Sequence, residues 1–206
     1  LAPPRALEIT KQVTEALTAA HELGIVHRDL KPDNIIVTKS KSGREVAKVV
    51  DFGIAKAIAE SPDRRLTETG LVIGTPTYMS PEQADGQRVG PASDLYSLGV
   101  VAYQMLTGRP PFMAETPVAL LVAHMHKPLP PPRSLNPALS ERVEATLFKM
   151  MAKDPVDRFA TCADFVRALQ ATDRSSSSEP SAPIRPEAIP EVTVVPMVSA
   201  PPPVVR

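Results

Sequence analysis

The chain has 206 residues, which is enough for one domain of ordinary size or for part of a larger one. Its 23 basic and 23 acidic side chains cancel, so the net charge gives no reason to expect a nucleic acid or an anionic membrane as the main partner. The single cysteine excludes an internal disulfide framework and fits a reducing, cytoplasmic compartment, and no apolar run reaches the roughly 18 residues that a membrane span needs.

The first element that the sequence predicts is an amphipathic helix that begins after two prolines. Its apolar positions recur at helical spacing, at Ala6, Ile9, Val13, Leu17 and Ala20. Two β-branched runs follow at 35–37 and 46–50, separated by a turn rich in Lys, Ser and Gly. Such a pair of runs predicts a β-hairpin.

Helices dominate the rest of the predicted domain. Residues 95–106 are apolar on nearly every face, which is typical of a buried central helix, and Gly108 follows its end. Thr116 suits the cap of another helix, and Pro117 suits the first position of that helix. The pattern therefore predicts a mainly α-helical bundle with a single hairpin.

A last helix closes the predicted domain, and a tail of different composition follows it. Thr161 and Asp164 form the pattern of a capping box for this helix, so residues 1–172 are read as the domain. From Arg174 onward, 33 residues hold 8 prolines and no Phe, Tyr or Leu. A segment of this composition buries too little apolar surface to offset its ordering entropy, so residues 173–206 are predicted to be a disordered Pro/Ser-rich linker.

Oxygen donors gather around the predicted hairpin. Asp29 and Asn34 lie on one loop just before its first strand, and Asp51 follows its second strand. Carboxylate and amide oxygens at this density suit Mg²⁺. A carboxylate left free of metal can accept a proton from a hydroxyl, and Lys31 can reach the same centre as a point charge. These groups are the equipment of phosphoryl transfer, in which catalysis consists mostly of positioning and neutralising charge.

The sequence around these donors resembles a protein kinase. Residues 27–34 read His-Arg-Asp-Leu-Lys-Pro-Asp-Asn, and Asp51, Phe52 and Gly53 supply the Asp-Phe-Gly that follows in kinases. The pattern resembles the C-terminal lobe of that family, a helical lobe with a catalytic-loop hairpin. The resemblance implies that Phe52 packs to set the position of Asp51 and that Gly53 is structural.

The resemblance implies roles for the other residues of this loop. Asp29 would orient the acceptor hydroxyl as a base, and Asn34 and Asp51 would hold magnesium ions beside ATP. Lys31 would serve both catalysis and ATP binding, and a lysine at this position is typical of the Ser/Thr class. His27 would support the loop as a structural residue and would not bind metal.

Similar motifs continue along the chain. Residues 74–82 resemble the end of a kinase activation segment, with Thr75 as the threonine that contacts the catalytic aspartate. Asp94 resembles the aspartate that opens the buried central helix and hydrogen-bonds the catalytic loop. Arg158 resembles the arginine that pairs with the glutamate of the activation segment, here Glu82. The wording of these motifs is most similar to bacterial Ser/Thr kinases of the eukaryotic-like, or Hanks, type.

The resemblance also implies sites of regulation. Thr69 and Thr67 precede Thr75 by 75 − 69 = 6 and 75 − 67 = 8 residues, the spacing of phosphorylated threonines in bacterial kinases of this type. Arg28 would receive the phosphate and order the segment. A kinase dimer would serve for trans-autophosphorylation.

The complete protein is expected to transfer the γ-phosphoryl group of Mg-ATP to Ser or Thr hydroxyls of protein substrates. No G-x-G-x-x-G pattern occurs and nothing precedes the first helix, so the N-terminal lobe is absent and the isolated chain should be inactive. Because the chain begins with Leu1 and not with Met, the sequence leaves open whether the parent protein has a membrane anchor elsewhere.

Two alternative functions are open at this stage. One is a non-catalytic, pseudokinase-like relic or protein-binding scaffold, against which the intact Asp29, Asn34 and Asp51 argue. The other is a small-molecule kinase of the aminoglycoside phosphotransferase type, which shares the spacing of the aspartate and asparagine. The Ser-Pro-Glu segment and Arg158 argue against this second alternative.

Overall fold

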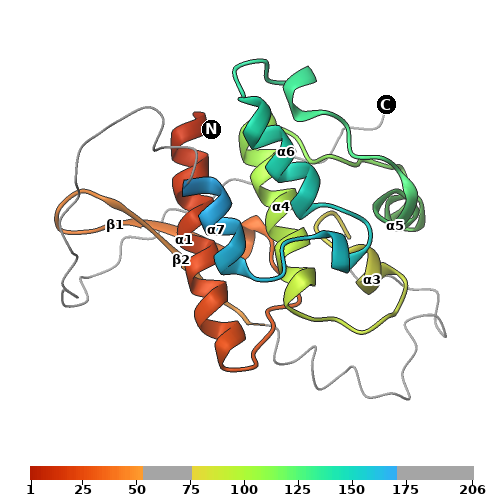
Figure 1. Ribbon diagram of the computed structural model, residues 1–206, viewed down its shortest axis with the longest axis horizontal. Coiled ribbons are helices and arrows are strands. Elements are labelled where there is room, and N and C mark those ends of the chain that lie inside the picture. The colour runs from red at the N-terminus through yellow and green to blue at the C-terminus, as the bar shows by residue number, and fades with distance from the viewer. Residues whose placement is uncertain (53–75, 171–206) are drawn as a thin grey trace.

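The computed structural model of the chain describes residues 1–52 and 76–170, which fold into helices and one small sheet (Figure 1). The helices are α1 (Pro3–Glu22), α3 (Pro81–Ala84), α4 (Pro91–Thr107), α5 (Pro117–His126), α6 (Glu141–Met150) and α7 (Cys162–Gln170), and the strands are β1 (Ile35–Lys39) and β2 (Glu45–Val49). Short 3₁₀ turns cover Pro32–Asn34, Pro132–Ser134 and Pro155–Asp157. The predicted combination of many helices with one hairpin is confirmed for these residues.

Helix α4 is the centre of the core. Every residue from 93 to 103 is buried, as the apolar run predicted. The helix begins at Pro91, and Asp94 lies in its first turn, as the resemblance implied. Ser93 and Asp94 are polar residues just before the apolar run, and hydrogen bonds hold both side chains inside the protein. Gly108 ends the helix in the left-handed conformation, with φ +85°.

Gly99 allows the end of α6 to approach α4 closely. A Cβ atom at this position would lie 2.7 Å from Met151 Cγ and 3.2 Å from Met150 Cβ. Both methionines are buried. The packing of these two helices therefore requires a residue without a side chain at position 99.

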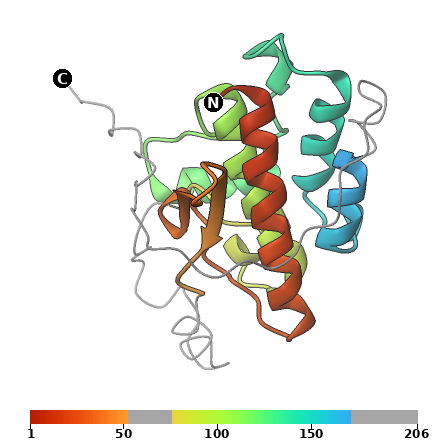
Figure 2. The same cartoon turned by 90° about the vertical axis from the view of Figure 1, so that its left-hand side faces the viewer.

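Helix α1 packs against α4, α7 and β2. Figure 2 shows α1 running between the hairpin on one side and α6 and α7 on the other. Four of its predicted apolar positions are buried, namely Ala6, Ile9, Val13 and Leu17. The predicted amphipathic face is therefore the face that meets the core.

The hairpin is attached to α1 through a side-chain amide. Strands β1 and β2 pair antiparallel, with Ile35 opposite Val49. On the other side of β2, Gln12 donates to the carbonyl oxygen of Glu45 at 3.3 Å and accepts the N–H of Ala47 at 2.8 Å. An isolated hairpin is only marginally stable in water, so this attachment helps to fix where the two ends of the hairpin lie.

The predicted caps of the later helices are confirmed. Thr116 Oγ1 accepts the N–H of Ala119 at 3.2 Å at the start of α5. Before α7, Thr161 and Asp164 exchange hydrogen bonds between side chain and main chain, each at 3.1 Å. Among the described helices, none combines the length and the apolar character that crossing a bilayer would require.

Several sequence predictions fall outside the described residues: Gly53, Thr67, Thr69, Thr75, the domain boundary at 172 and the tail of 173–206.

Candidate functional site

A buried histidine holds the loop of residues 27–34. His27 is fully buried; its Nε2 lies 3.0 Å from the carbonyl oxygen of Val50, and its Nδ1 accepts the N–H of Asp29 at 3.3 Å. Because a carbonyl oxygen can only accept, Nε2 carries the proton and Nδ1 remains the acceptor. The ring also packs on Phe52, with 4.8 Å between the ring centroids. His27 thus ties the loop to the residue that follows β2.

Asp94, in the first turn of α4, holds the main chain of the same loop. Its carboxylate accepts the N–H groups of His27 and Arg28, each at 2.8 Å, and lies 2.7 Å from Nε2 of His21. Arg28 has φ +65°, a left-handed conformation that costs a non-glycine residue about 1–3 kcal/mol. The contact that the resemblance implied for Asp94 is present. The contact of His21 with Asp94 was not predicted from the sequence.

The side chains of Lys31 and Asn34 converge on Asp29. Lys31 Nζ donates to Asp29 Oδ2 at 3.1 Å, and Asn34 Nδ2 donates to the Asp29 carbonyl oxygen at 2.8 Å. Asn34 is buried, whereas the side chains of Asp29 and Lys31 are 31% and 37% exposed. A ligand arriving from solvent can therefore reach the carboxylate and the ammonium group, while Asn34 stays fixed beneath them.

The hairpin returns Asp51 toward this group. The N–H of Val50 donates to the carbonyl oxygen of Asn34 at 3.0 Å, so the residue before Asp51 is fixed to the end of the loop. Asp51 is exposed and has φ +54°, a second left-handed residue in the site. Two non-glycine residues therefore have this conformation: Arg28, which precedes the donor Asp29, and the donor Asp51 itself.

Asn34 and Asp51 offer oxygen atoms that suit a hard cation. Because Nδ2 of Asn34 is engaged with Asp29, Oδ1 is its amide atom left for a ligand. The described part of the chain holds no cluster of three His, Cys, Asp or Glu that would enclose a metal without help. Mg²⁺ needs no such cluster, since it usually keeps several waters and binds one or two carboxylates together with substrate phosphates. The residues present therefore fit a magnesium ion bound with a phosphate ligand.

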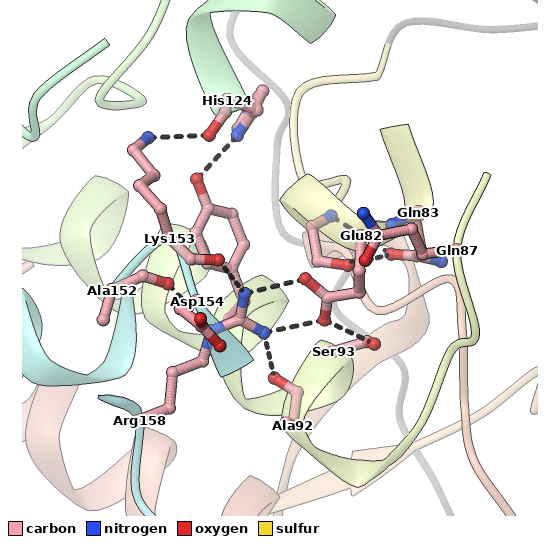
Figure 3. Close-up of polar contacts among 12 residues, drawn as sticks. Glu82, Gln83, Gln87, Ala92, Ser93, His124, Ala152, Lys153, Asp154 and Arg158 are labelled. Carbon is pink, nitrogen blue, oxygen red and sulfur yellow. Dashed lines mark hydrogen bonds and ion pairs between the residues drawn. The ribbon is translucent and has the colours of Figure 1, made fainter. Parts of the chain in front are cut away.

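A buried ion pair anchors the segment that leads into α4. Arg158 Nη1 and Nη2 donate to the two carboxylate oxygens of Glu82, each at 2.7 Å, and both side chains are almost fully buried (Figure 3). Ser93 donates to the same carboxylate at 2.6 Å. Burial alone would raise the pKa of Glu82, but the hydrogen bonds from Arg158 and Ser93 outweigh it and hold the pKa below its usual value. The pair that the resemblance implied is present.

The guanidinium group of Arg158 also donates hydrogen bonds to the main chain. The additional acceptors are the main-chain carbonyl oxygens of Ala92, Ala152 and Lys153. Together with the two carboxylate oxygens, they supply five acceptors, which matches the five N–H donors of an arginine. The guanidinium group also lies over the ring of Tyr96, 5.0 Å from its centroid. This residue therefore joins α3, α4 and the segment after α6.

One contact of the loop was not predicted. Gln83 in α3 donates from Nε2 to the carbonyl oxygen of Arg28 at 2.8 Å. The sequence could indicate the contact of Gln83 with Ser80, since this pair matches a capping box. The contact of Gln83 with Arg28 joins residues 55 positions apart and has no local signature in the sequence.

Two buried titratable groups have packing roles. Burial raises the pKa of Cys162 to about 12, and its Sγ lies 3.6 Å from Nδ1 of His21. Burial and the nearby charge of Lys153 lower the pKa of His124 to about 4. Both side chains are buried in the core.

Comparison with protein families places the chain among kinases. The protein kinase domain family matches residues 1–170. The serine/threonine-protein kinase Pkn1 of Myxococcus xanthus is 50% identical over 171 residues, which cover 82% of this chain and 24% of Pkn1. The serine/threonine-protein kinase PknB of Mycolicibacterium smegmatis is 40% identical over 202 residues, which cover 98% of this chain and 31% of PknB. The chain thus spans about a quarter to a third of the length of these relatives.

Solved structures give the same fold. The kinase domain of PknI from Mycobacterium tuberculosis, a double mutant, aligns with a TM-score of 0.60 and 26% identity over 83% of this chain and 55% of that chain. Rad53 in complex with AMP-PNP aligns with a TM-score of 0.65 and 25% identity over 82% of this chain and 40% of that chain.

Proposed function

The chain belongs to the protein kinase family, and we propose that it is the C-terminal, substrate-binding lobe of a Ser/Thr kinase that transfers the γ-phosphoryl group of Mg-ATP to protein hydroxyls. The observation that carries this proposal is the convergence of Lys31 and Asn34 on Asp29 beside the returning hairpin. A carboxylate, an ammonium group and oxygen donors for magnesium are the parts that phosphoryl transfer uses. The curated relatives described above carry the name of Ser/Thr kinases, which supports the same reaction.

In the proposed reaction, the carboxylate of Asp29 accepts the proton of the acceptor hydroxyl. The hydroxyl oxygen forms a bond to the γ-phosphorus while the bond between that phosphorus and the bridging oxygen of ATP breaks, which leaves ADP. Lys31, whose Nζ lies 3.1 Å from Asp29 Oδ2, places a positive charge beside the phosphoryl oxygens. Asn34 and Asp51 would hold Mg²⁺, which neutralises phosphate charge when it is bound.

The remaining part of the ATP site would come from a second lobe. Kinases hold the phosphates with a glycine-rich loop and a strand lysine, and the 206 residues contain no G-x-G-x-x-G pattern. We therefore expect the chain alone to be inactive and to gain activity when an ATP-binding lobe is supplied in front of Leu1. Intact Asp29 and Asn34 disfavour a decayed scaffold, and the Glu82–Arg158 pair disfavours a small-molecule kinase.

Regulation by phosphate is part of the proposal. Phosphorylation of Thr69 or Thr67 would add about −1.5 to −2 charges and three acceptor oxygens, for which Arg28 is the proposed partner. A second copy of the kinase would deliver the phosphate in trans. Mass spectrometry of the active protein should find phosphate on these threonines, and the Thr67→Ala/Thr69→Ala variant should lose activity. A fully active double variant without phosphate would contradict this switch.

The decisive test of the reaction compares two aspartates of the same loop. With an ATP-binding lobe supplied, Asp29→Asn should lower Ser/Thr peptide phosphorylation by about 10² to 10⁴-fold, because it removes the proton acceptor. Asp33→Asn is the matched control, since Asp33 is exposed and the chemical change is identical. Circular dichroism should show that both variants fold. Equal activity of the two variants would contradict the proposed function.

A further inference from the structure

The peptide bond between Arg28 and Asp29 is held at both of its polar ends. The N–H of Asp29 donates to Nδ1 of His27 at 3.3 Å, and the carbonyl oxygen of Arg28 accepts from Nε2 of Gln83 at 2.8 Å. The preceding N–H, that of Arg28, is held at 2.8 Å by Asp94. These hydrogen bonds restrain ψ of Arg28 and φ of Asp29, the torsions that together determine where the Asp29 side chain leaves the main chain.

The side chain of Gln83 is itself fixed in one orientation. Its Oε1 accepts the N–H and the hydroxyl of Ser80, each at 3.1 Å, as part of the capping box that begins α3. A main-chain N–H needs an acceptor and a carbonyl oxygen needs a donor, so the amide nitrogen must face Arg28. Figure 3 shows Gln83 next to Glu82, whose ion pair with Arg158 anchors the same short helix.

Arg28 needs such support because its backbone is strained. A non-glycine residue at φ +65° costs about 1–3 kcal/mol and persists only when its surroundings hold it. Asp94 holds the N–H of this residue from α4, and Gln83 holds its carbonyl oxygen from α3. Without the contact from α3, the peptide plane before Asp29 would keep the longer, 3.3 Å hydrogen bond to His27 but lose the 2.8 Å hydrogen bond to Gln83.

We propose that Gln83 is a positioning residue, which orients Asp29 for phosphoryl transfer by holding the carbonyl oxygen of Arg28. The inference rests on the proposed kinase function, since the orientation of Asp29 matters only if that residue receives the hydroxyl proton. Gln83 lies in the segment of residues 76–84, which ends with α3. The contact therefore couples the position of this segment to the geometry of the catalytic carboxylate.

The test uses two substitutions of Gln83 and a matched control. Gln83→Glu keeps an acceptor for Ser80 but removes the donor to Arg28, and Gln83→Met removes both. Gln87→Glu makes the same chemical change at an exposed residue four positions later, whose side chain donates to Asp85. With an ATP-binding lobe supplied, both Gln83 variants should lower kcat by about 10- to 100-fold while KM for ATP stays within about twofold.

A second measurement does not depend on catalysis. Hydrogen exchange of the Asp29 amide in the 206-residue chain should become about tenfold faster in the Gln83 variants and stay unchanged in Gln87→Glu. If kcat is retained in an active kinase, or if exchange is unchanged, Gln83 does not position Asp29. If the unsubstituted two-lobed protein shows no transfer, the proposed function fails, and unchanged exchange would then separately overturn the role of Gln83.

Discussion

Removing Arg158 should destabilise this fold far more than removing an arginine from a surface pair. Arg158→Ala takes five hydrogen bonds away and, among the residues that the structure describes, leaves Ser93 as the side-chain donor to the buried carboxylate of Glu82. Breaking a buried pair by deleting one partner costs about 3–5 kcal/mol, because the other charge stays buried without compensation. With a urea m-value of about 2 kcal/mol/M, the unfolding midpoint should fall by about 2 M.

The chain offers a control with the same chemistry at the surface. Arg5 binds the carboxylate of Glu45 through two hydrogen bonds of 2.8 Å, but these side chains are 49% and 32% exposed. Arg5→Ala should therefore cost about 0–1 kcal/mol. Urea unfolding of both variants, followed by circular dichroism, measures the two losses side by side.

The pH dependence of the stability loss in Arg158→Ala gives a second check. In Arg158→Ala, Glu82 remains buried without its cation, so its pKa rises above the usual value instead of falling below it. Lowering the pH then protonates the unpaired carboxylate in the folded variant. The difference in unfolding free energy between the variant and the unsubstituted protein should therefore become smaller. The reasoning would be refuted if Arg158→Ala and Arg5→Ala lost equal unfolding free energy. It would also be refuted if the difference between Arg158→Ala and the unsubstituted protein grew toward acid pH.

Three further predictions concern the core. The pKa of His124 falls from 6.5 to about 4 on folding, so the unfolded chain binds a proton that the folded chain excludes, and stability should drop by up to about 3 kcal/mol as the pH falls from 6.5 to 4. His124→Gln should flatten this part of a urea-unfolding series across pH. Gly99→Ala should cost about 1–3 kcal/mol in thermal or urea unfolding, since the added Cβ would lie 2.7 Å from Met151 Cγ. Cys162, which is 2% exposed with a pKa of about 12, should react with a thiol reagent at pH 8 only as fast as the fold opens, and rapid labelling of the native protein would contradict this.

Local patterns in the sequence predicted the elements that depend on neighbouring residues. The apolar run of α4, the β-branched strands and the cap at Thr116 each depend on interactions within a few positions. The apolar run alone did not show that Ser93 and Asp94 are buried, because the partners of their side chains lie elsewhere in the chain. A polar residue beside an apolar run looks exposed until its hydrogen-bond partner is known.

The candidate site was predictable in its residue types but not in its supports. Asp29 and Asn34 could be named because their spacing matches a known motif. The contact of His21 with Asp94 joins residues 73 positions apart, and neither residue carries a local signal for the other. The same holds for Gln83, whose donor meets a main-chain carbonyl that any residue would supply. Groups that shape the main chain around a site become visible only in three dimensions.

The attachment of β2 to α1 has a consequence for association between chains. A two-stranded sheet leaves the outer N–H and C=O groups of its strands unpaired, and such groups can recruit a strand from another molecule. Gln12 occupies one donor and one acceptor of β2 with a single amide, and therefore stands in for a third strand. Helix α1 thus protects the β2 edge of the hairpin against intermolecular strand addition at these two residues.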